Sequence, residues 1–458
     1  MAKKNEVIPS ARRLIKSLRD MGYDFSSAIA DLVDNSIEAS ASLVSIDIEF
    51  DGDDSWVRIA DNGKGMTPVE LKEAMRYGSD RNYEEEDLGK FGLGLKTASL
   101  SQCQRLIVAS RTNTERADIT AYCWDLEHIS KSDRWEIIAL KKKGLSPTIR
   151  RPLKKTRGTV ILWQRLDRIL GYKQPYGEMA RKRLLTMCRE VEEHLGMVFH
   201  RFLSGEVSKR KLKIMLNGNT IEPWDPFARQ EKKTKALQPV VITLEHEGVV
   251  GEVKLDPYVL PHQNDFSSPD AFKRSSGPAN WNQQQGFYIY RADRLIQSGG
   301  WCRLRTLDEH TKLARIALSF SPMLDEAFKI NVAKMRVQLP LQIREQAEHE
   351  TKTVVKIARE VYNRPSSRPV LTCSNRPITE QTTPASSSVI SGQVLQTKSK
   401  SSTVPEQKDC GFLGAQRVWT IEELYSRLID LANDEEKPIV SRIFNRFRQC
   451  LKKKGEIE

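Results

Sequence analysis

Apolar residues recur at intervals of three and four in several segments, a spacing that is typical of helices burying one face. Residues 11–21 and 24–39 predict two short helices on either side of Gly22, and Asp24 or Ser26 can cap the second one. The same spacing over residues 177–203 predicts a long helix that closes a first domain. A further helix is predicted from about residue 340 to residue 362.

Alternating apolar and polar residues predict strands between these helices. The pattern covers residues 43–50, 56–59, 240–244, 249–255 and 286–290. Asn217-Gly218 separates two short β-rich runs, and this dipeptide suits the positive φ angles of a two-residue hairpin turn. We therefore expect a mixed α/β fold.

The same patterns divide the 458 residues into four parts. We expect an α/β domain over residues 1–204, a second over residues 205–364, a linker over residues 365–417 and a small helical segment over residues 418–458. The linker contains 5 Pro, 10 Ser and 6 Thr among 53 residues, a composition that favours a flexible tether. The final segment has too little apolar surface to fold alone, so we expect it to dock elsewhere.

Composition argues against a disordered, secreted or membrane-spanning chain. Hydrophobic residues make up 39% of it, which is enough for a sizeable core. No apolar run approaches the roughly 18 residues of a membrane span, and the first residues are charged instead of apolar. The seven cysteines show no close pairing of the kind that zinc ligands need. We expect a reduced, cytoplasmic protein without a membrane segment.

The formal net charge of +13 is concentrated in one segment. Residues 130–216 contain 22 Lys or Arg and 8 Asp or Glu, a net charge of +14, so the rest of the chain is close to neutral. This segment includes Lys141-Lys142-Lys143, Arg150-Arg151 and Arg181-Lys182-Arg183. A local excess favours a polyanion partner, although an ordinary solvated surface remains an open interpretation on charge alone.

Three short motifs follow one another in the first hundred residues. Asp31, Asn35 and Glu38 share one face of a predicted helix, which places a carboxylate one turn from an amide oxygen. Asp61-Asn62-Gly63-Lys64-Gly65-Met66 follows a predicted strand and lets the backbone approach a flat ligand. Each motif taken alone could be an ordinary polar helix face or a surface turn.

The third motif is glycine-rich and leads into a helix: Leu88-Gly89-Lys90-Phe91-Gly92-Leu93-Gly94-Leu95-Lys96-Thr97. It is not a Walker P-loop, because Leu95 occupies the position where that motif requires Lys. It also lacks the dinucleotide pattern G-x-G-x-x-G. The first backbone N–H groups of the helix that follows the glycines could bind phosphate.

The three motifs together, in this order and spacing, resemble the GHKL ATPases, the group of gyrase, heat-shock chaperone, histidine kinase and MutL. Within that group the residues from Asp34 to Ala39 and from Gly89 to Lys96 are most similar to MORC-type ATPases and their prokaryotic relatives. The resemblance covers roughly residues 9–340. It implies a Bergerat-type two-layer α/β sandwich, followed by a ribosomal-protein-like transducer domain.

The resemblance also implies ATP and Mg²⁺ as ligands. Asp31 would be the catalytic base, Asn35 would coordinate Mg²⁺, and Asp61 would accept a hydrogen bond from the adenine amino group. The other expected ATP-binding residues shape the adenine pocket or contact the phosphates: Gly63, Gly65, Met66, Gly89, Lys90, Gly92, Leu93, Gly94, Lys96, Thr97 and Thr159. Residues 67–90 would form the mobile part of the lid.

The second domain would contribute one catalytic group. Residues 217–226 and 286–296 look like the transducer domain of MORC and MutL relatives, whose lysine contacts the γ-phosphate. Lys334 occupies the matching place, and a plain surface lysine is the alternative. The base departs from the family pattern, because Asp31 stands where Glu is usual. Since a misplacement of about 1 Å can cost on the order of 10²-fold in rate, we expect slow hydrolysis.

These expectations favour an ATP-gated homodimer that binds double-stranded DNA through residues 130–216. Prokaryotic MORC-like proteins, which it would resemble, often belong to antiphage or DNA-maintenance systems. A chaperone-like or scaffolding ATPase that reaches a protein partner through the C-terminal tail is the alternative. A histidine kinase is disfavoured because no His precedes Asp31, and a topoisomerase because little chain remains for a cleavage domain.

Overall fold

The computed structural model describes residues 9–20, 23–77, 94–113, 119–172, 174–207, 212–330 and 337–364, together with Ile429, Lys437 and Ser441. The chain divides into two units, Met1–Val370 and Leu371–Glu458. The predicted linker and almost all of the predicted helical tail lie outside the described residues, so both remain predictions.

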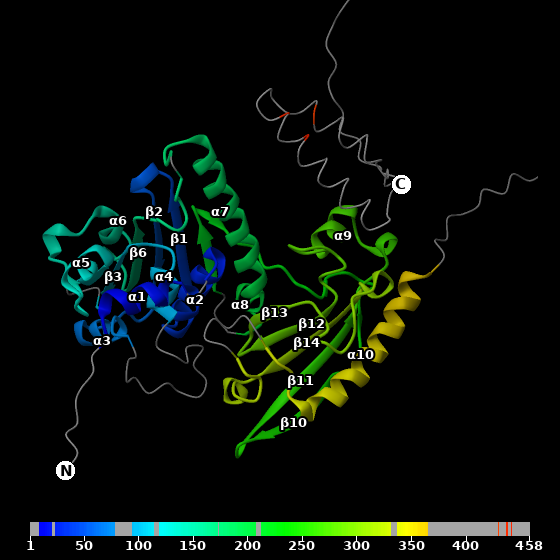
Figure 1. Ribbon diagram of the computed structural model, residues 1–458. Coiled ribbons are helices and arrows are strands. Elements are labelled where there is room, and N and C mark those ends of the chain that lie inside the picture. The colour runs from blue at the N-terminus through cyan, green and yellow to red at the C-terminus, as the bar shows by residue number, and fades with distance from the viewer. Residues whose placement is uncertain are drawn as a thin grey trace, which may run out of the picture. The chain divides into compact units, whose positions relative to one another are not determined.

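The first unit contains an eight-stranded sheet in the order β5-β4-β3-β6-β2-β1-β7-β8 (Figure 1). Its strands pair antiparallel except β1 with β7, which run parallel. The strands are β1 (Leu43–Glu49), β2 (Trp56–Asp61), β3 (Arg105–Arg111), β4 (Thr120–Asp125), β5 (Ile138–Ala139), β6 (Gly158–Gln164), β7 (Lys213–Leu216) and β8 (Asn219–Thr220).

Helices cover mainly one face of this sheet, and the largest core lies between the two layers. They are α1 (Ala11–Arg19), α2 (Phe25–Glu38), α3 (Pro68–Ala74), α4 (Gly94–Leu100), α5 (Leu126–Ser132), α7 (Glu178–Val198) and α8 (His200–Ser204). On the opposite face a smaller apolar cluster packs Leu145, Ile149 and Leu153, in and around α6 (Pro147–Arg150), against the strands. This architecture confirms the predicted α/β sandwich.

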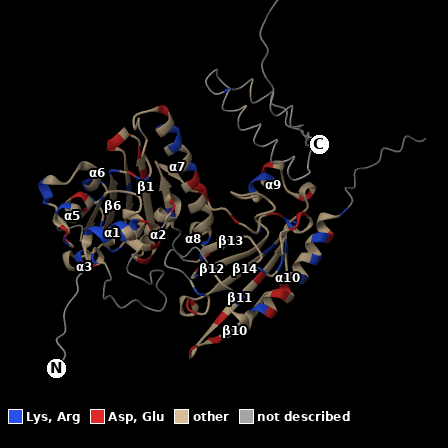
Figure 2. Ribbon diagram, in the orientation of Figure 1, with Lys and Arg blue, Asp and Glu red and all other residues tan. Residues whose placement is uncertain are grey.

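The second sheet follows in the same unit, in the order β10-β11-β14-β12-β13, with β9 paired to β11. Its strands are β9 (Lys235–Ala236), β10 (Val240–His246), β11 (Val249–Val259), β12 (Gly286–Arg291), β13 (Arg294–Ser298) and β14 (Ala314–Phe320), and α9 (Pro269–Ser275) lies between β11 and β12 in the chain. The long helix α10 (Leu341–Tyr362) crosses one face and buries Ile343, Val354 and Ala358 against it. Figure 2 shows both charge signs along α10.

Local sequence signals explain several of these elements. Asp24 caps α2 by accepting hydrogen bonds from the backbone N–H and the hydroxyl of Ser27, at 2.9 and 2.6 Å. Asn217 and Gly218 have φ angles of 47° and 84°, as the predicted hairpin turn requires. The long helix predicted over residues 177–203 is interrupted at Phe199, where φ is −105°, and continues as α8.

The hairpin of β7 and β8 differs from its expected place. The sequence assigns it to the second domain, but β7 pairs with β1 and extends the first sheet. A parallel pair needs a long connection between its strands, and the chain between β1 and β7 includes the long helix α7. We therefore propose that the domain boundary lies after Thr220 instead of after residue 204, and that the second domain runs to residue 364.

Candidate functional site

Helix α2 carries the first candidate residues and is fixed by its buried face. Ala28, Ile29, Leu32 and Val33 are completely buried in the core between helices and sheet. Asp31 and Asn35 lie one turn apart on the adjoining face. Asp31 is also buried, with 5% of its surface exposed, whereas Asn35 is half-buried. Burying a carboxylate is costly without a partner, so its contacts define its role.

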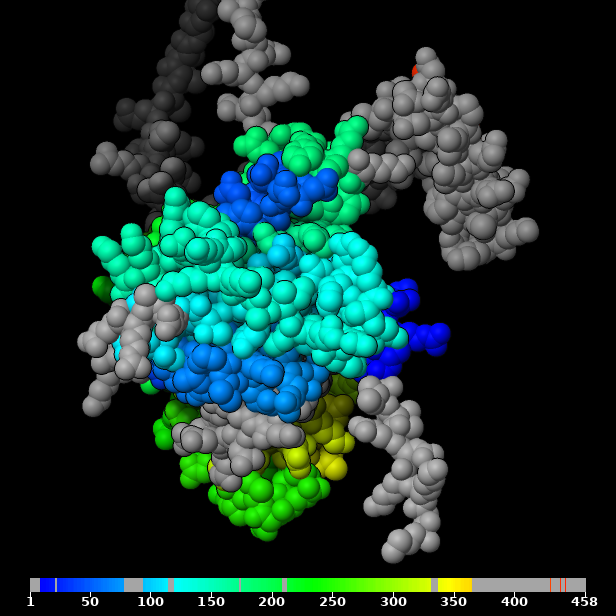
Figure 3. Space-filling model, turned by 90° about the vertical axis from the view of Figure 1, so that its left-hand side faces the viewer, coloured from blue at the N-terminus to red at the C-terminus, as the bar shows by residue number. Residues whose placement is uncertain are grey.

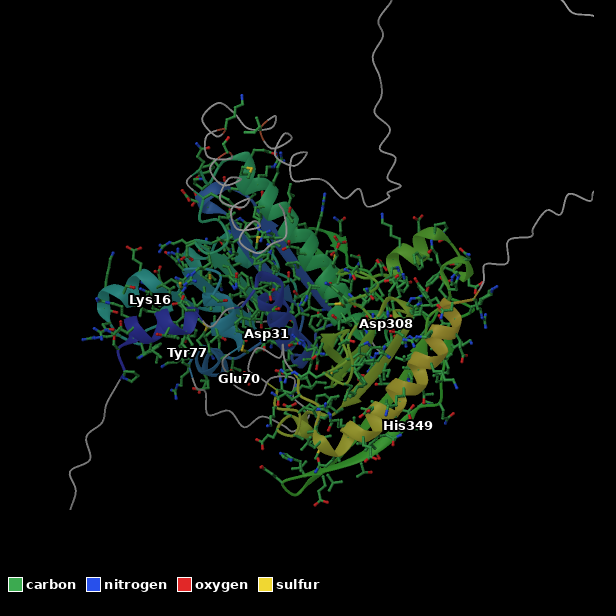
Figure 4. All side chains as sticks on the ribbon, turned by 45° about the vertical axis from the view of Figure 1, so that its right-hand side comes forward. Lys16, Asp31, Glu70, Tyr77, Asp308 and His349 are labelled. Atoms are coloured by element: carbon green, nitrogen blue, oxygen red, sulfur yellow. The ribbon has the colours of Figure 1, made fainter. Side chains whose placement is uncertain are left out.

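Asp31 pairs with a residue of the second sheet. Arg294, at the start of β13, places its Nη2 3.3 Å from Oδ1 of Asp31, and its Nε 2.9 Å from Oδ1 of Asp34. Tyr23 also lies near Asp31, and burial, with a smaller effect from the Asp31 charge, raises the pKa of Tyr23 far above its ordinary value. Figure 4 shows Asp31 on the side of the first sheet's helices that faces the second sheet.

Asn35 fits the metal-binding role expected of it. Its half-buried amide has no hydrogen-bond partner among the described residues, which leaves its oxygen available. An amide oxygen beside carboxylates is a donor set that suits Mg²⁺. No three His, Cys, Asp or Glu side chains of the described chain form a metal-binding group by themselves, so a metal here would also need ligands from phosphate or water.

Asp61, at the end of β2, lies in a network of short polar contacts. Its Oδ1 accepts hydrogen bonds from the backbone N–H groups of Gly63 at 2.8 Å and Thr159 at 3.3 Å. Its Oδ2 accepts a hydrogen bond from the hydroxyl of Ser36 on α2 at 3.4 Å. Burial raises the pKa of Asp61 to about 6, although these hydrogen bonds oppose the shift. The carboxylate is thus oriented by neutral donors.

Three glycines allow the backbone segments in and around the Asp61 network to pack closely. Gly158 has φ +141°, and a β-carbon there would overlap the carbonyl oxygen of Asp61. Gly65 has φ +69°, and a β-carbon there would overlap the carbonyl oxygen of Arg111. A β-carbon on Gly63 would lie 2.7 Å from the carbonyl oxygen of Ala39, so this position is crowded as well. Any residue larger than glycine at these positions would push the segments apart.

A serine that the sequence did not single out joins the segments. The hydroxyl of Ser110 on β3 accepts a hydrogen bond from the N–H of Met66 at 2.8 Å and donates one to the carbonyl of Gly158 at 2.9 Å. Its oxygen also lies 3.1 Å from Oγ1 of Thr159. The structure therefore brings Asp61, Gly63, Gly65, Met66 and Thr159 together, and their roles in ATP binding remain predictions. No motif pointed to Ser110, because its partners are distant in the sequence.

Helix α4 places the described part of the glycine-rich motif beside α2. A β-carbon on Gly94 would lie 3.9 Å from Oδ2 of Asp31. Thr97 is buried and lies near Tyr23. Gly89, Lys90, Gly92 and Leu93 lie outside the described residues, and so does Lys334. Their roles therefore stay predictions.

Lys96 is buried in a different environment from the one expected of a phosphate ligand. Its Nζ donates a hydrogen bond to the carbonyl of Ala74 at 3.0 Å and lies 5.8 Å from the centre of the Tyr77 ring. Burial lowers the pKa of Lys96 to about 8. These contacts tie α4 to the end of α3, which lies inside the segment predicted as the lid. The assignment of Lys96 to phosphate remains a prediction.

Comparison with known proteins finds a family match over this part of the chain. Residues 23–159 match the family model described as histidine kinase-, DNA gyrase B-, and HSP90-like ATPase. This range contains both α2 and the Asp61 network. Residues 23–159 are thus similar to the ATPase domains of the GHKL superfamily. The matched range includes β1 to β5 and reaches the first residues of β6.

Similar proteins include DNA mismatch repair proteins named MutL. The MutL of Shewanella amazonensis is 41% identical over 98 residues, which are 20% of this chain and 15% of that protein. The MutL of Salmonella arizonae is 26% identical over 217 residues, 46% of this chain and 31% of that protein. The chain thus matches less than a third of the length of either relative.

One negative finding concerns the membrane. None of the helices within the described residues combines the length and the apolar character that crossing a bilayer would require.

Proposed function

We propose that the protein binds and slowly hydrolyses ATP with Mg²⁺, and that nucleotide binding gates a dimeric, MORC-like DNA clamp. The Asp61 network is the observation that carries the proposal. It combines a buried carboxylate acceptor, close-packed glycines and a link through Ser36 to α2, all inside the matched range. A flat base with an exocyclic amino group is the ligand that such an acceptor recognises.

The chain's own residues divide the chemistry between them. Asp61 accepts a hydrogen bond from the adenine amino group, and Asn35 provides an oxygen for Mg²⁺. When bound, Mg²⁺ neutralises charge on the phosphates. Oδ2 of Asp31 accepts a proton from the attacking water, since Oδ1 is held by Arg294. Because Asp is shorter than Glu, we expect slow turnover, which suits a timer that holds a closed dimer.

The proposed DNA contact rests on an exposed basic surface of the first sheet. Residues 141–157 contain eight Lys or Arg and no Asp or Glu, and all eight side chains are exposed. Arg58 and Arg111 attach this segment to the sheet through the carbonyls of Thr148 and Leu153. In the side view of Figure 3 the cyan surface that includes these residues covers much of the visible face. Eight cations without acids favour a phosphate backbone.

Nucleotide binding and turnover test the ATPase part. Asp31→Asn should bind ATP with nearly wild-type affinity and lose hydrolysis, because the amide cannot accept the proton. Asn35→Ala should lose the Mg²⁺-dependent part of the affinity. Equal turnover in wild type and Asp31→Asn would exclude Asp31 as the base.

Salt-dependent binding of double-stranded DNA tests the clamp. Reversing Lys141, Lys142 and Lys143 to Glu should lower the affinity at least about tenfold and make the salt slope less steep by about one to three. A matched control reverses three exposed lysines of the second domain, Lys232, Lys235 and Lys273. Equal losses in both triple variants would show a non-specific charge effect and argue against this surface. A DNA affinity that does not change with the salt concentration would argue against any phosphate contact.

A further inference from the structure

The contacts of Arg294 connect the candidate base to the second sheet. Asp31 and Asp34 lie on α2, and Arg294 begins β13, some 260 residues later in the chain. All three side chains are almost completely buried, with exposures of 5%, 1% and 4%. One guanidinium of the second sheet therefore contacts two buried carboxylates of helix α2.

The two carboxylates are held unequally. Nε of Arg294 lies 2.9 and 2.8 Å from the two oxygens of Asp34, which makes this the tighter pair. Nη2 lies 3.3 Å from Oδ1 of Asp31, a longer contact to a single oxygen. The other oxygen of Asp31, Oδ2, faces the position of a β-carbon on Gly94, 3.9 Å away. Asp34 thus anchors the guanidinium, and the guanidinium sets which oxygen of Asp31 faces the glycine-rich motif.

Other groups lie around the cluster. Tyr23 lies near Asp31, whose charge helps to raise its pKa. His194 on α7 lies near Arg294 and Asp34, and burial lowers its pKa to about 4, so it is neutral at pH 7. The Phe199 ring centre lies 5.9 Å from the Arg294 guanidinium carbon. Arg294 is a cation that both carboxylates share.

The strand that supplies Arg294 is fixed to the first sheet's helices. Asp293, the preceding residue, pairs with Arg201 of α8 at 2.8 Å. Arg201 also stacks over the Tyr290 ring at 3.5 Å, and Tyr290 hydrogen-bonds His200 at 2.8 Å. A displacement of the second sheet would thus move Arg294 relative to α2. The position of Asp31 depends on how the second sheet is docked.

We propose that Arg294 is a positioning residue for ATP hydrolysis, which holds Oδ1 of Asp31 and makes cleavage depend on the docked second sheet. The inference rests on the proposed function, in which Asp31 is the base. Arg294 contributes no atom to the reaction. It orients the carboxylate, and it transmits the state of the second sheet to the site.

Kinetics of the full-length protein test this role. Arg294→Lys keeps the charge but lacks the fork that reaches two carboxylates, so it should lower kcat about tenfold or more. The dissociation constant for ATP should stay within about threefold, since Arg294 does not touch the proposed adenine pocket. Arg291→Lys is a matched control, because Arg291 is equally buried and pairs with Asp325 inside the second sheet's domain, at 2.7 Å. This control should lower the melting temperature and leave kcat within about twofold.

A second variant separates positioning from folding. Arg294→Met combined with Asp34→Asn removes one cation and one anion, so the buried cluster keeps its net charge while Asp31 loses its guanidinium. It should melt closer to wild type than Arg294→Met alone and still lose kcat. Wild-type kcat in the double variant, a kcat increase, or losses equal to those of Arg291→Lys would each overturn the inference. Wild-type hydrolysis no faster than that of Asp31→Asn would instead overturn the proposed function, and this inference with it.

Discussion

Replacing Asp61 by Asn should stabilise the protein while removing its proposed nucleotide recognition. The Asn side chain has the same shape, and its Oδ1 can still accept hydrogen bonds from the N–H groups of Gly63 and Thr159. Its amide nitrogen can donate to the Ser36 hydroxyl. The variant loses only the charge, which is buried and oriented by neutral donors. It also presents an N–H where the adenine amino group would need an acceptor.

The magnitude follows from the pKa of Asp61. Burial raises this pKa from its ordinary value of 3.8 to about 6, so the folded protein holds the proton more tightly than the unfolded chain. The carboxyl therefore stabilises the fold fully below pH 3.8, and that stability is lost as the pH rises through about 6. A shift of about two units corresponds to about 3 kcal/mol of unfolding free energy above pH 7. Asp61→Asn should recover up to this amount.

Urea unfolding of both proteins at several pH values measures this difference. The advantage of Asp61→Asn should be about 1.4 kcal/mol larger at pH 8 than at pH 5. Asp53→Asn is the control, because Asp53 is exposed and loses the same charge; its effect should not vary in that way. A stability difference for Asp61→Asn that is constant with pH, or that shrinks as the pH rises, would refute the reasoning. ATP binding by Asp61→Asn at wild-type affinity would refute the adenine assignment.

Two further substitutions test the packing that holds the site. Gly158→Ala should destabilise the protein by about 2 kcal/mol or more in urea unfolding, because its β-carbon would overlap the Asp61 carbonyl oxygen; Gly144→Ala, where a β-carbon meets nothing within 4 Å, is the control. Tyr290→Phe should cost about 1–3 kcal/mol, since it removes the hydroxyl partner of the buried His200. An unchanged unfolding midpoint in either variant would contradict the contact on which it depends.

Several elements of the fold were predictable because their signals are local. A capping Asp24, an Asn-Gly turn and three-to-four spacing each depend on residues within about one or two helical turns. The helix and strand limits that they predict agree with α2, β7, β8 and α10 to within a few residues. The sheet order is not local. The parallel pairing of β7 with β1 joins segments some 170 residues apart, so the local turn signal could not show which sheet the hairpin joins.

The residues of the candidate site also differ in how far the sequence could predict them. Asp31, Asn35 and Asp61 lie in short motifs with fixed spacing, so a resemblance could point to them. No motif could point to Ser110 or Arg294, because each contacts partners on other strands or helices. The sequence shows that Lys96 carries a charge, but it does not show where the side chain points. The Nζ of Lys96 donates to the carbonyl of Ala74, whose position depends on how α3 packs.

The acidic residues of the proposed site differ in the groups that contact their carboxylates. No cation is among the groups that shift the pKa of Asp61, and three neutral donors orient it. Asp31 and Asp34 instead share the guanidinium of Arg294. An acceptor for a neutral amino group needs no cation, and a cation there would compete with the base for its lone pairs. A base beside a polyphosphate lies among strong negative charges, and a buried guanidinium offsets part of that charge. The contrast in partners therefore supports the proposal that Asp61 recognises adenine and Asp31 transfers a proton.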